Sequence, residues 1–284
     1  MSDLLQRFIF DNTDIRGELV HLEQSYRDVL SIHPYPDVVA ALLGEFLAAA
    51  ALLSATIKFD GILTLQARSD GEIPLIMAEA SSDHSLRAIA REAQAASSQD
   101  FNTLLTNGQL SITIDPQQGQ RYQGIVELNG NNLAQCLEAY FQHSEQLSTR
   151  IWLCSNGRQA AGMLLQELPA SQTADAELRE QRWQHATQLA ATVTEQELLT
   201  LAFETLLHRL YHREPVRLFA ADSLYFKCSC SRARTLDALR TLGQQELETL
   251  LAEQAGIDIN CEFCHQHYRF TQKDIHGLFQ QAMH

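Results

Sequence analysis

Alternating apolar and polar residues predict β-strands in the first 170 residues. Leu63, Leu65 and Ala67 alternate with polar neighbours, which is the period of a strand with one buried face. The alternation recurs on either side of the turn sequence at 115–119, so two further strands should pair there as a hairpin. Their apolar-face positions are Leu110, Ile112 and Ile114 before the turn, and Tyr122, Gly124, Val126 and Leu128 after it.

Longer apolar runs predict helices. Residues 37–57 are rich in alanine and leucine and contain no proline, which predicts a helix that begins after Pro36 with Asp37 as its N-cap. The most apolar part, 46–57, is about half as long as a membrane span. We therefore expect a buried core helix, and no membrane partner. A second helical face contains Leu133, Cys136, Leu137, Tyr140 and Phe141.

A second strand pair, 151–154 with 162–168, is expected across Asn156-Gly157. Cys154 lies in the first of these strands and Cys136 in the helix before them. Both fall on apolar faces, and Cys154 has no cysteine near it in sequence, so we expect both to be inert buried thiols.

The composition changes after residue 170. Residues 171–215 carry helix-forming residues and almost no strand signal, which predicts a helical linker with a capping box from Thr194 to Glu197. An apolar stripe at helical spacing follows, and we expect it to pack on the preceding domain in at least one state of the protein. Its members are Leu199, Phe203, Leu206 and Leu210.

The last segment, 216–284, has helical stretches at 235–242 and 245–254 and an aromatic strand at 268–270. Its apolar content is too thin to offset its chain entropy, so its fold needs a further source of stability. The sequence thus predicts an α+β protein: a mixed α/β core domain (1–170), a helical linker (171–215) and a small C-terminal domain (216–284).

Two cysteine pairs carry the clearest chemistry. Cys228 and Cys230 are separated by one residue, and Cys261 and Cys264 by two. Two such chelating pairs can supply the four soft ligands of a tetrahedral Zn²⁺ site. Residues 216–284 are therefore expected to form a small zinc-binding domain, with the metal supplying much of its folding free energy, about 10 kcal/mol or more. A pair separated by one residue can also close into a small disulfide ring, so the same sulfurs suit metal or oxidant. A purely structural zinc site stays open as an alternative, and His265, next to Cys264, could compete as a ligand.

Charge argues against nucleic acid as a partner. The net charge is −14, residues 1–170 contain twenty acidic side chains against ten Lys or Arg, and residues 221–284 contain eight against six. A nucleic-acid-binding zinc module needs a basic face. The N-terminus lacks the pattern of a secretory signal, so we expect a cytoplasmic protein whose cysteines are reduced.

The motifs of nucleotide-binding loops, zinc proteases and serine hydrolases are absent from the sequence, and we expect a protein that is not an enzyme. A thiol-disulfide oxidoreductase would place its cysteine pair beside a βαβ unit. Residues 216–284, with helical stretches and a short strand, do not resemble such a unit. A zinc-stabilised regulatory or nucleic-acid-binding protein, and an enzyme with an unrecognised site in the core domain, remain alternatives.

The cysteine pairs in their local frames, 226–232 and 261–264 followed by Tyr268 and Phe270, resemble those of the bacterial redox-regulated heat-shock chaperones, the 33 kDa chaperonin family. The resemblance extends through the whole chain. It includes segments 16–20, 58–61, 121–124, 144–147, 161–166 and 209–212, in the family's order.

This resemblance implies a redox-regulated, ATP-independent holdase. The four cysteines would hold one zinc ion per chain when reduced. Oxidation would form the disulfides Cys228–Cys230 and Cys261–Cys264 and release the metal. The oxidised protein would then dimerise and bind unfolded or oxidatively damaged client proteins through the core domain. Within the linker, the stripe Leu199, Phe203, Leu206 and Leu210 supplies our candidate client-binding residues.

Overall fold

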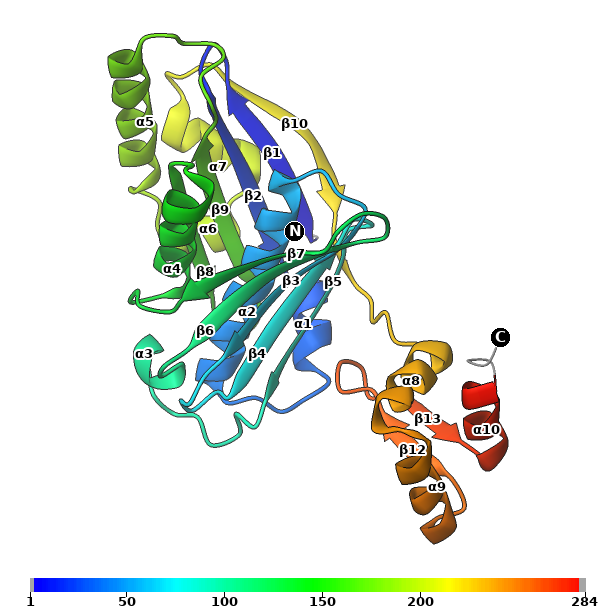
Figure 1. Cartoon of the computed structure of the whole chain (residues 1–284). Coiled ribbons are helices and arrows are strands. Elements are labelled where there is room, and N and C mark those ends of the chain that lie inside the picture. Colours follow the sequence, from blue (N-terminus) through cyan, green and yellow to red (C-terminus); the bar gives the residue numbers. More distant parts are fainter. Residues whose placement is uncertain (1–2, 281–284) are drawn as a thin grey trace. The chain divides into compact units, whose positions relative to one another are not determined.

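The computed structural model describes residues 3–280, and the chain divides into two compact units between Lys227 and Cys228. Figure 1 shows the elements of the first unit in blue through yellow and those of the second in orange and red. The first unit combines two sheets with helices, and the second contains short helices and a two-stranded sheet. The expected α+β class is confirmed.

The first sheet contains β1 (Leu4–Phe10), β2 (Ile15–Leu22), β8 (Thr149–Ser155), β9 (Ala160–Glu167) and β10 (Val216–Ser223). It is antiparallel throughout, in the order β10-β1-β2-β9-β8. The predicted hairpin across Asn156-Gly157 is present as β8 and β9. Nearly every residue of β9 is buried, which requires cover on both faces of this sheet.

The second sheet contains β3 (Gly61–Arg68), β4 (Leu75–Ser81), β5 (Ser85–Arg91), β6 (Gln109–Pro116), β7 (Tyr122–Glu127) and β11 (Tyr225–Phe226). Its order is β11-β5-β4-β3-β6-β7, and only β11 pairs in parallel. Leu63, Leu65 and Ala67 are buried as the alternation predicted. β6 and β7 form the predicted hairpin. A short helix, α3 (Phe101–Leu104), precedes β6.

The core helix α2 (Asp37–Thr56) contacts strands of both sheets, and α1 (Gln24–Leu30) precedes it. By length and hydropathy α2 could cross a membrane, but 72% of its most apolar window is buried inside the protein. The expectation of a buried core helix is confirmed. Its N-cap is Pro36 rather than Asp37, because Pro36 keeps an extended backbone while Asp37 already has helical geometry.

α4 (Leu133–Tyr140) continues into one π-helical turn, η1 (Phe141–Glu145), packs on β8 and adds its buried residues to the hydrophobic cluster around α2. The linker helices cover the other face of the first sheet. The expected linker forms α5 (Ala176–Ala190), α6 (Glu195–Thr200) and α7 (Phe203–Tyr211), and the predicted capping box at Thr194 is present. The linker helices form a second hydrophobic cluster with residues of the first sheet, which include Phe8, Phe10, Leu19, Met163 and Leu165.

The apolar stripe is part of that cluster. Leu199, Phe203, Leu206 and Leu210 are all buried. The backbone is fastened there as well, because Nε2 of the buried His21 on β2 lies 2.9 Å from the carbonyl oxygen of Leu199. The linker is therefore a docked layer of the first unit in this structure, as the sequence predicted for one state.

The second unit contains α8 (Arg232–Leu239), the 3₁₀ turn η2 (Arg240–Leu242), α9 (Gln244–Glu253), the strands β12 (Ile257–Asn260) and β13 (His267–Phe270), and α10 (Gln272–Gln280). The helical stretches and the aromatic strand expected here are present. Its buried apolar cluster is small and contains Leu239, Leu247, Phe270 and Ile275, and Leu278 of α10 is also buried.

The compact unit that contains all four clustered cysteines begins later than the sequence division at 216. β10 pairs with β1 from Val216 to Ser223, and β11 pairs with β5, so both strands belong to the first unit. The sequence could not indicate this, because β10 is largely exposed and lacks apolar alternation. An edge strand of this kind is specified by its partner's backbone rather than by its own pattern.

Candidate metal centre

The first cysteine pair lies in the extended segment that leads into α8. The side chain of Ser231 caps this helix by accepting a hydrogen bond from the Arg234 amide. Cys228 and Cys230 are two residues apart on extended chain, so their side chains point to the same side and can reach one ligand. Both are partly buried.

The second pair lies in the turn between β12 and β13. The amide of Cys261 donates to the Gln266 carbonyl, and the amide of His265 donates to the Cys261 carbonyl over 2.7 Å. His265 has a left-handed backbone (φ 55°), which turns the chain back into β13. The tight loop holds Cys261 and Cys264 on one side of the hairpin, the arrangement of a zinc knuckle.

The four sulfur atoms converge. All Sγ atoms of Cys228, Cys230, Cys261 and Cys264 lie within 4.8 Å of one another. The separations Cys228–Cys261 and Cys230–Cys264 are 3.6 Å and 3.4 Å, and all four are free thiols. Zinc–sulfur bonds of about 2.3 Å in a tetrahedron require sulfur separations of roughly 3.8 Å. The donor set therefore fits a four-coordinate soft metal ion. His265 is not a member of the cluster.

Hydrogen bonds already favour a thiolate at one member of the cluster. Burial opposes ionisation of Cys230, but the Tyr268 hydroxyl, 3.1 Å from Sγ, and the neighbouring thiols outweigh burial and lower its pKa. Burial raises the pKa of Cys261 and of Cys264. Without metal the cluster shares protons, and a cation would displace them because it binds thiolates.

Arg232 ties the ligand segments together. Its Nη1 donates to the Arg269 carbonyl over 2.6 Å, its Nη2 lies 2.9 Å from Asp274, and its guanidinium lies 4.6 Å from the centre of the Phe270 ring. These contacts join the start of α8 to β13 and α10. The sequence alone does not reveal these contacts of Arg232 and Tyr268, because they join segments about forty residues apart.

The remaining two cysteines lie in the first unit. Cys136 and Cys154 are buried free thiols. Burial raises the pKa of Cys136, and burial with the nearby Glu195 and Glu45 raises that of Cys154 to about 12. Neither belongs to the metal-competent cluster. Such thiols are poor nucleophiles near neutral pH.

Comparisons with known proteins agree on one family. The family model described as "Hsp33 protein" matches residues 3–271. A "33 kDa chaperonin" from Pseudomonas aeruginosa (strain LESB58) is 56% identical over 284 residues, which cover 99% of this chain and 96% of the relative. One from Azotobacter vinelandii is 55% identical over 280 residues, with 98% and 94% covered.

A solved structure is similar over the whole chain. The crystal structure of a 33 kDa chaperonin (heat shock protein 33 homolog) from Thermotoga maritima aligns with a TM-score of 0.79 and covers 99% of each chain. The two sequences are 18% identical. This likeness supports the fold, including the small C-terminal unit that carries the cysteines.

Proposed function

The chain belongs to the Hsp33 protein family, and from that premise we propose that this chaperone is a redox-regulated, ATP-independent holdase that oxidants activate. The observation that carries the proposal is the convergence of four cysteine sulfurs within 4.8 Å. A cluster of this kind can exist as a metal thiolate or as disulfides, but not as both. It can therefore couple the redox state of its surroundings to the fold of the second unit.

In the reduced state Cys228, Cys230, Cys261 and Cys264 would bind one Zn²⁺ per chain. Among the described residues of this unit, four form its buried apolar cluster and Leu278 is also buried, so burial alone supplies little of its stability. Metal binding would add about 10 kcal/mol. The second unit would thus be folded when metal is bound and unfolded when it is not.

Oxidation would proceed at the sulfurs without a catalytic residue. One thiolate attacks hydrogen peroxide to give a sulfenic acid and hydroxide, and its partner thiolate then forms the disulfide and releases a second hydroxide. Each peroxide thus takes two electrons from one cysteine pair. We propose the pairs Cys228–Cys230 and Cys261–Cys264. After the first disulfide forms, at most two sulfur ligands remain and the zinc ion would leave.

Metal loss would then expose client-binding surface. We propose that the folded second unit keeps the linker docked, so that its unfolding lets α6 and α7 leave the first sheet. The stripe Leu199, Phe203, Leu206 and Leu210 would then become accessible, together with the sheet face beneath it. Burial of apolar client surface contributes roughly 25 cal/mol per Å² and needs no nucleotide.

The other partners follow from the same proposal. The clients would be unfolded or oxidatively damaged proteins, and the oxidised chain would act as a homodimer in the cytoplasm. We propose no enzymatic activity, no nucleic-acid partner and no membrane partner. The eight acidic side chains of residues 221–284, against six basic ones, would repel phosphate backbones.

The test combines zinc content with light scattering of an unfolding client protein. The reduced chain should contain one zinc per chain and leave client aggregation unchanged. After peroxide treatment at mildly raised temperature it should have lost the zinc and suppressed aggregation at substoichiometric to stoichiometric ratios. Zinc loss without suppression would contradict the proposed holdase. Suppression that is equally strong with zinc retained would contradict the proposed switch.

A further inference from the structure

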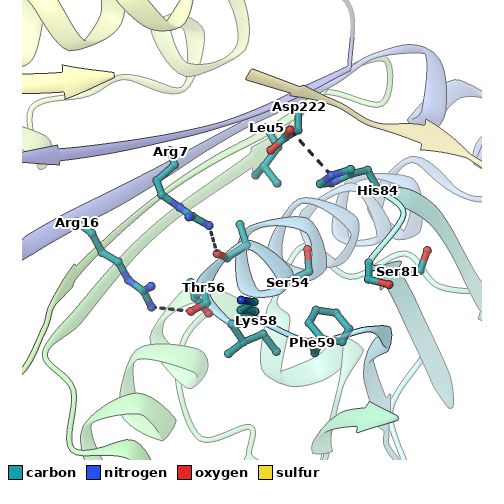
Figure 2. A pocket seen from close by; sticks show the side chains of 13 residues that line it. Leu5, Arg7, Arg16, Ser54, Thr56, Lys58, Phe59, Ser81, His84 and Asp222 are labelled. Carbon is teal, nitrogen blue, oxygen red and sulfur yellow. Dashed lines mark hydrogen bonds and ion pairs between the residues drawn. The ribbon is translucent and has the colours of Figure 1, made fainter. Parts of the chain in front are cut away.

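A cation-lined cavity of about 390 Å³ opens in the first unit where the end of α2 meets β1, β2 and the turn between β4 and β5. Figure 2 shows Arg7, Arg16, Lys58 and His84 around it. Among the described residues that line it, Asp222 is the single acid. Residues 1–170 as a whole carry two acids for each Lys or Arg, so the positive charge at this cavity is opposite in sign to the net charge of that segment.

The two arginines are held in place by the protein. Nη2 of Arg7 donates to the Ala55 carbonyl over 2.6 Å, and Nη2 of Arg16 donates to the Thr56 carbonyl over 3.0 Å. Nε of Arg16 also donates to Gln166. These bonds do not use Nη1 of either guanidinium. Both arginines thus retain donors with a fixed direction, which is the arrangement that recognises an oxyanion.

Glu18 neutralises these cations only in part. Its side chain is fully buried, Oε1 accepts from Nε of Arg7 over 2.9 Å, and Oε2 has no hydrogen-bond partner among the described residues. Burial raises the pKa of Glu18 to about 7, against the lowering effects of Arg7 and Arg16. Near neutral pH a large fraction of Glu18 is uncharged, so the guanidinium charges are available to a ligand.

The cavity is not polar throughout. Leu5, Ile57 and Phe59 line it beside Lys58, and the Phe59 ring lies among the labelled side chains of Figure 2. The exposed Lys58 makes no ion pair with the described residues. The volume is in the range of small-molecule sites. A bare phosphate would leave the apolar wall in contact with water.

We propose that this cavity binds a phosphorylated small molecule, with its phosphate group between Arg7, Arg16 and Lys58 and an apolar group against Ile57 and Phe59. The site lies entirely in the first unit and uses none of the clustered cysteines. It is therefore independent of the proposed redox switch. Binding there needs neither zinc nor oxidation.

Isothermal titration calorimetry of the full-length reduced chain tests this, with phenyl phosphate and sulfate as probes at an ionic strength fixed with NaCl. Phenyl phosphate should bind at one site per chain and more tightly than sulfate, because its ring covers the apolar wall. Lys58→Gln should weaken both probes about three- to fivefold, the range of an exposed charge pair. Arg158→Gln, which removes a positive charge in the turn between β8 and β9, should leave both affinities unchanged.

Glu18→Gln provides a test with the opposite sign. The amide can still accept from Arg7 but carries no charge, so at pH 8 this variant should bind sulfate severalfold more tightly than the wild type. At pH 6 the two proteins should converge, because Glu18 is then mostly protonated. His84 and Asp222 also face the cavity, as do Arg7, Arg16 and Lys58, but they are common to both proteins. Thermal unfolding of each variant checks that it is folded.

Three outcomes would overturn the site. They are the absence of saturable binding, equal losses in Lys58→Gln and Arg158→Gln, and a Glu18→Gln affinity that equals the wild type at pH 8. Equal affinities for phenyl phosphate and sulfate would overturn the apolar half of the proposal.

Discussion

The Tyr268 hydroxyl donates a hydrogen bond to Sγ of Cys230 over 3.1 Å. Tyr268 lies on β13 and Cys230 lies before α8, so the bond joins the two segments that supply the clustered sulfurs. Burial opposes ionisation of Cys230, and this hydrogen bond is the largest of the contributions that lower its pKa. Tyr268 thus stabilises a thiolate without being a ligand itself, as the partners of metal ligands commonly do.

Tyr268→Phe should weaken zinc binding about tenfold at pH 7, since a proton competes better for Cys230 when the hydrogen bond is gone. The deficit should shrink as the pH rises, because proton competition then fades. Titration with a chelator of known affinity measures it. Tyr225→Phe is the matched control, since that hydroxyl contacts Asp83 in the first unit. Equal zinc affinity in Tyr268→Phe and wild type at pH 7 would contradict this role.

Cys261→Ser should abolish stoichiometric zinc binding, because one of the four converging sulfurs is lost and a hydroxyl is a poor ligand for this ion. Metal analysis of the purified reduced variant measures the stoichiometry, and Cys136→Ser serves as the control. If Cys261→Ser keeps one zinc per chain at wild-type affinity, Cys261 is not a ligand. His265, which follows Cys264 directly, would then be the candidate for its replacement.

The double variant Cys136→Ala, Cys154→Ala should activate like the wild type on oxidation, because both thiols are buried and burial raises the pKa of each. Its stability should fall by about 1 kcal/mol per site as small cavities form. Client light scattering with and without peroxide measures activation. A folded double variant that gains no holdase activity on oxidation would show that the switch is not confined to the second unit.

Oxidation should raise amide hydrogen exchange across residues 175–215 together with residues 228–280, because metal loss would release the docked linker. Mass spectrometry of peptide exchange before and after peroxide measures both regions. A linker that stays as protected as in the reduced chain while the second unit exchanges fully would contradict the proposed release.

A truncation after Lys227 should suppress client aggregation without peroxide, because it lacks the whole second unit. The structure favours this end point over truncation after Pro215. The shorter chain would also lose β10, whose pairing with β1 completes the first sheet. Light scattering of an unfolding client with the reduced 1–227 chain and with the reduced full-length chain measures the gain in suppression. A folded 1–227 chain that is inactive, with a fully protected linker, would exclude the second unit as the element that keeps the linker docked.

Glu45→Gln should stabilise the first unit at alkaline pH. Glu45 of α2 and Glu195 of α6 line one cavity beside β8, and burial, with Glu195, raises the pKa of Glu45 to about 7 from an ordinary 4.5. The folded state therefore favours the proton, and wild-type stability should fall as pH rises from about 4.5 to about 7. The advantage of Glu45→Gln should grow over that window to about 1–3 kcal/mol at pH 8.

Thermal unfolding between pH 5 and pH 8 measures this advantage, with Glu204→Gln on the exposed side of α7 as the control. A constant difference between Glu45→Gln and wild type across that range would mean that Glu45 does not titrate there.

The sequence predicted those elements whose own pattern specifies them. The alternation at Leu63, Leu65 and Ala67 and the apolar run of α2 each reflect burial by a large neighbour, so periodicity was sufficient. The cysteine cluster was also predictable, because chelate spacing is a local property. β10 was not predicted as part of the core sheet, since an exposed edge strand owes its place to backbone pairing with β1.

Interactions between distant segments were also beyond reach of the sequence. The bond from Tyr268 to Cys230 depends on which segments meet in the second unit, and the contact of Glu18 with Arg7 depends on β1 pairing with β2. Charged residues on strands are usually expected to face water. Here Arg16 and Glu18 lie on the face of β2 that is turned toward α2, because they alternate with the residues that contact the linker.

The first sheet separates two hydrophobic clusters, one around α2 and one under the linker helices. This partition has a consequence for how the sequence can vary. Substitutions around α2 would change the stability of the first unit equally in the resting and the activated protein. Substitutions under the linker would change two properties at once: how firmly the linker stays docked in the resting protein, and how strongly the exposed surface binds clients after activation. Natural variation at Leu206 or Phe203 would then adjust the threshold of the response, whereas variation at Phe46 would not.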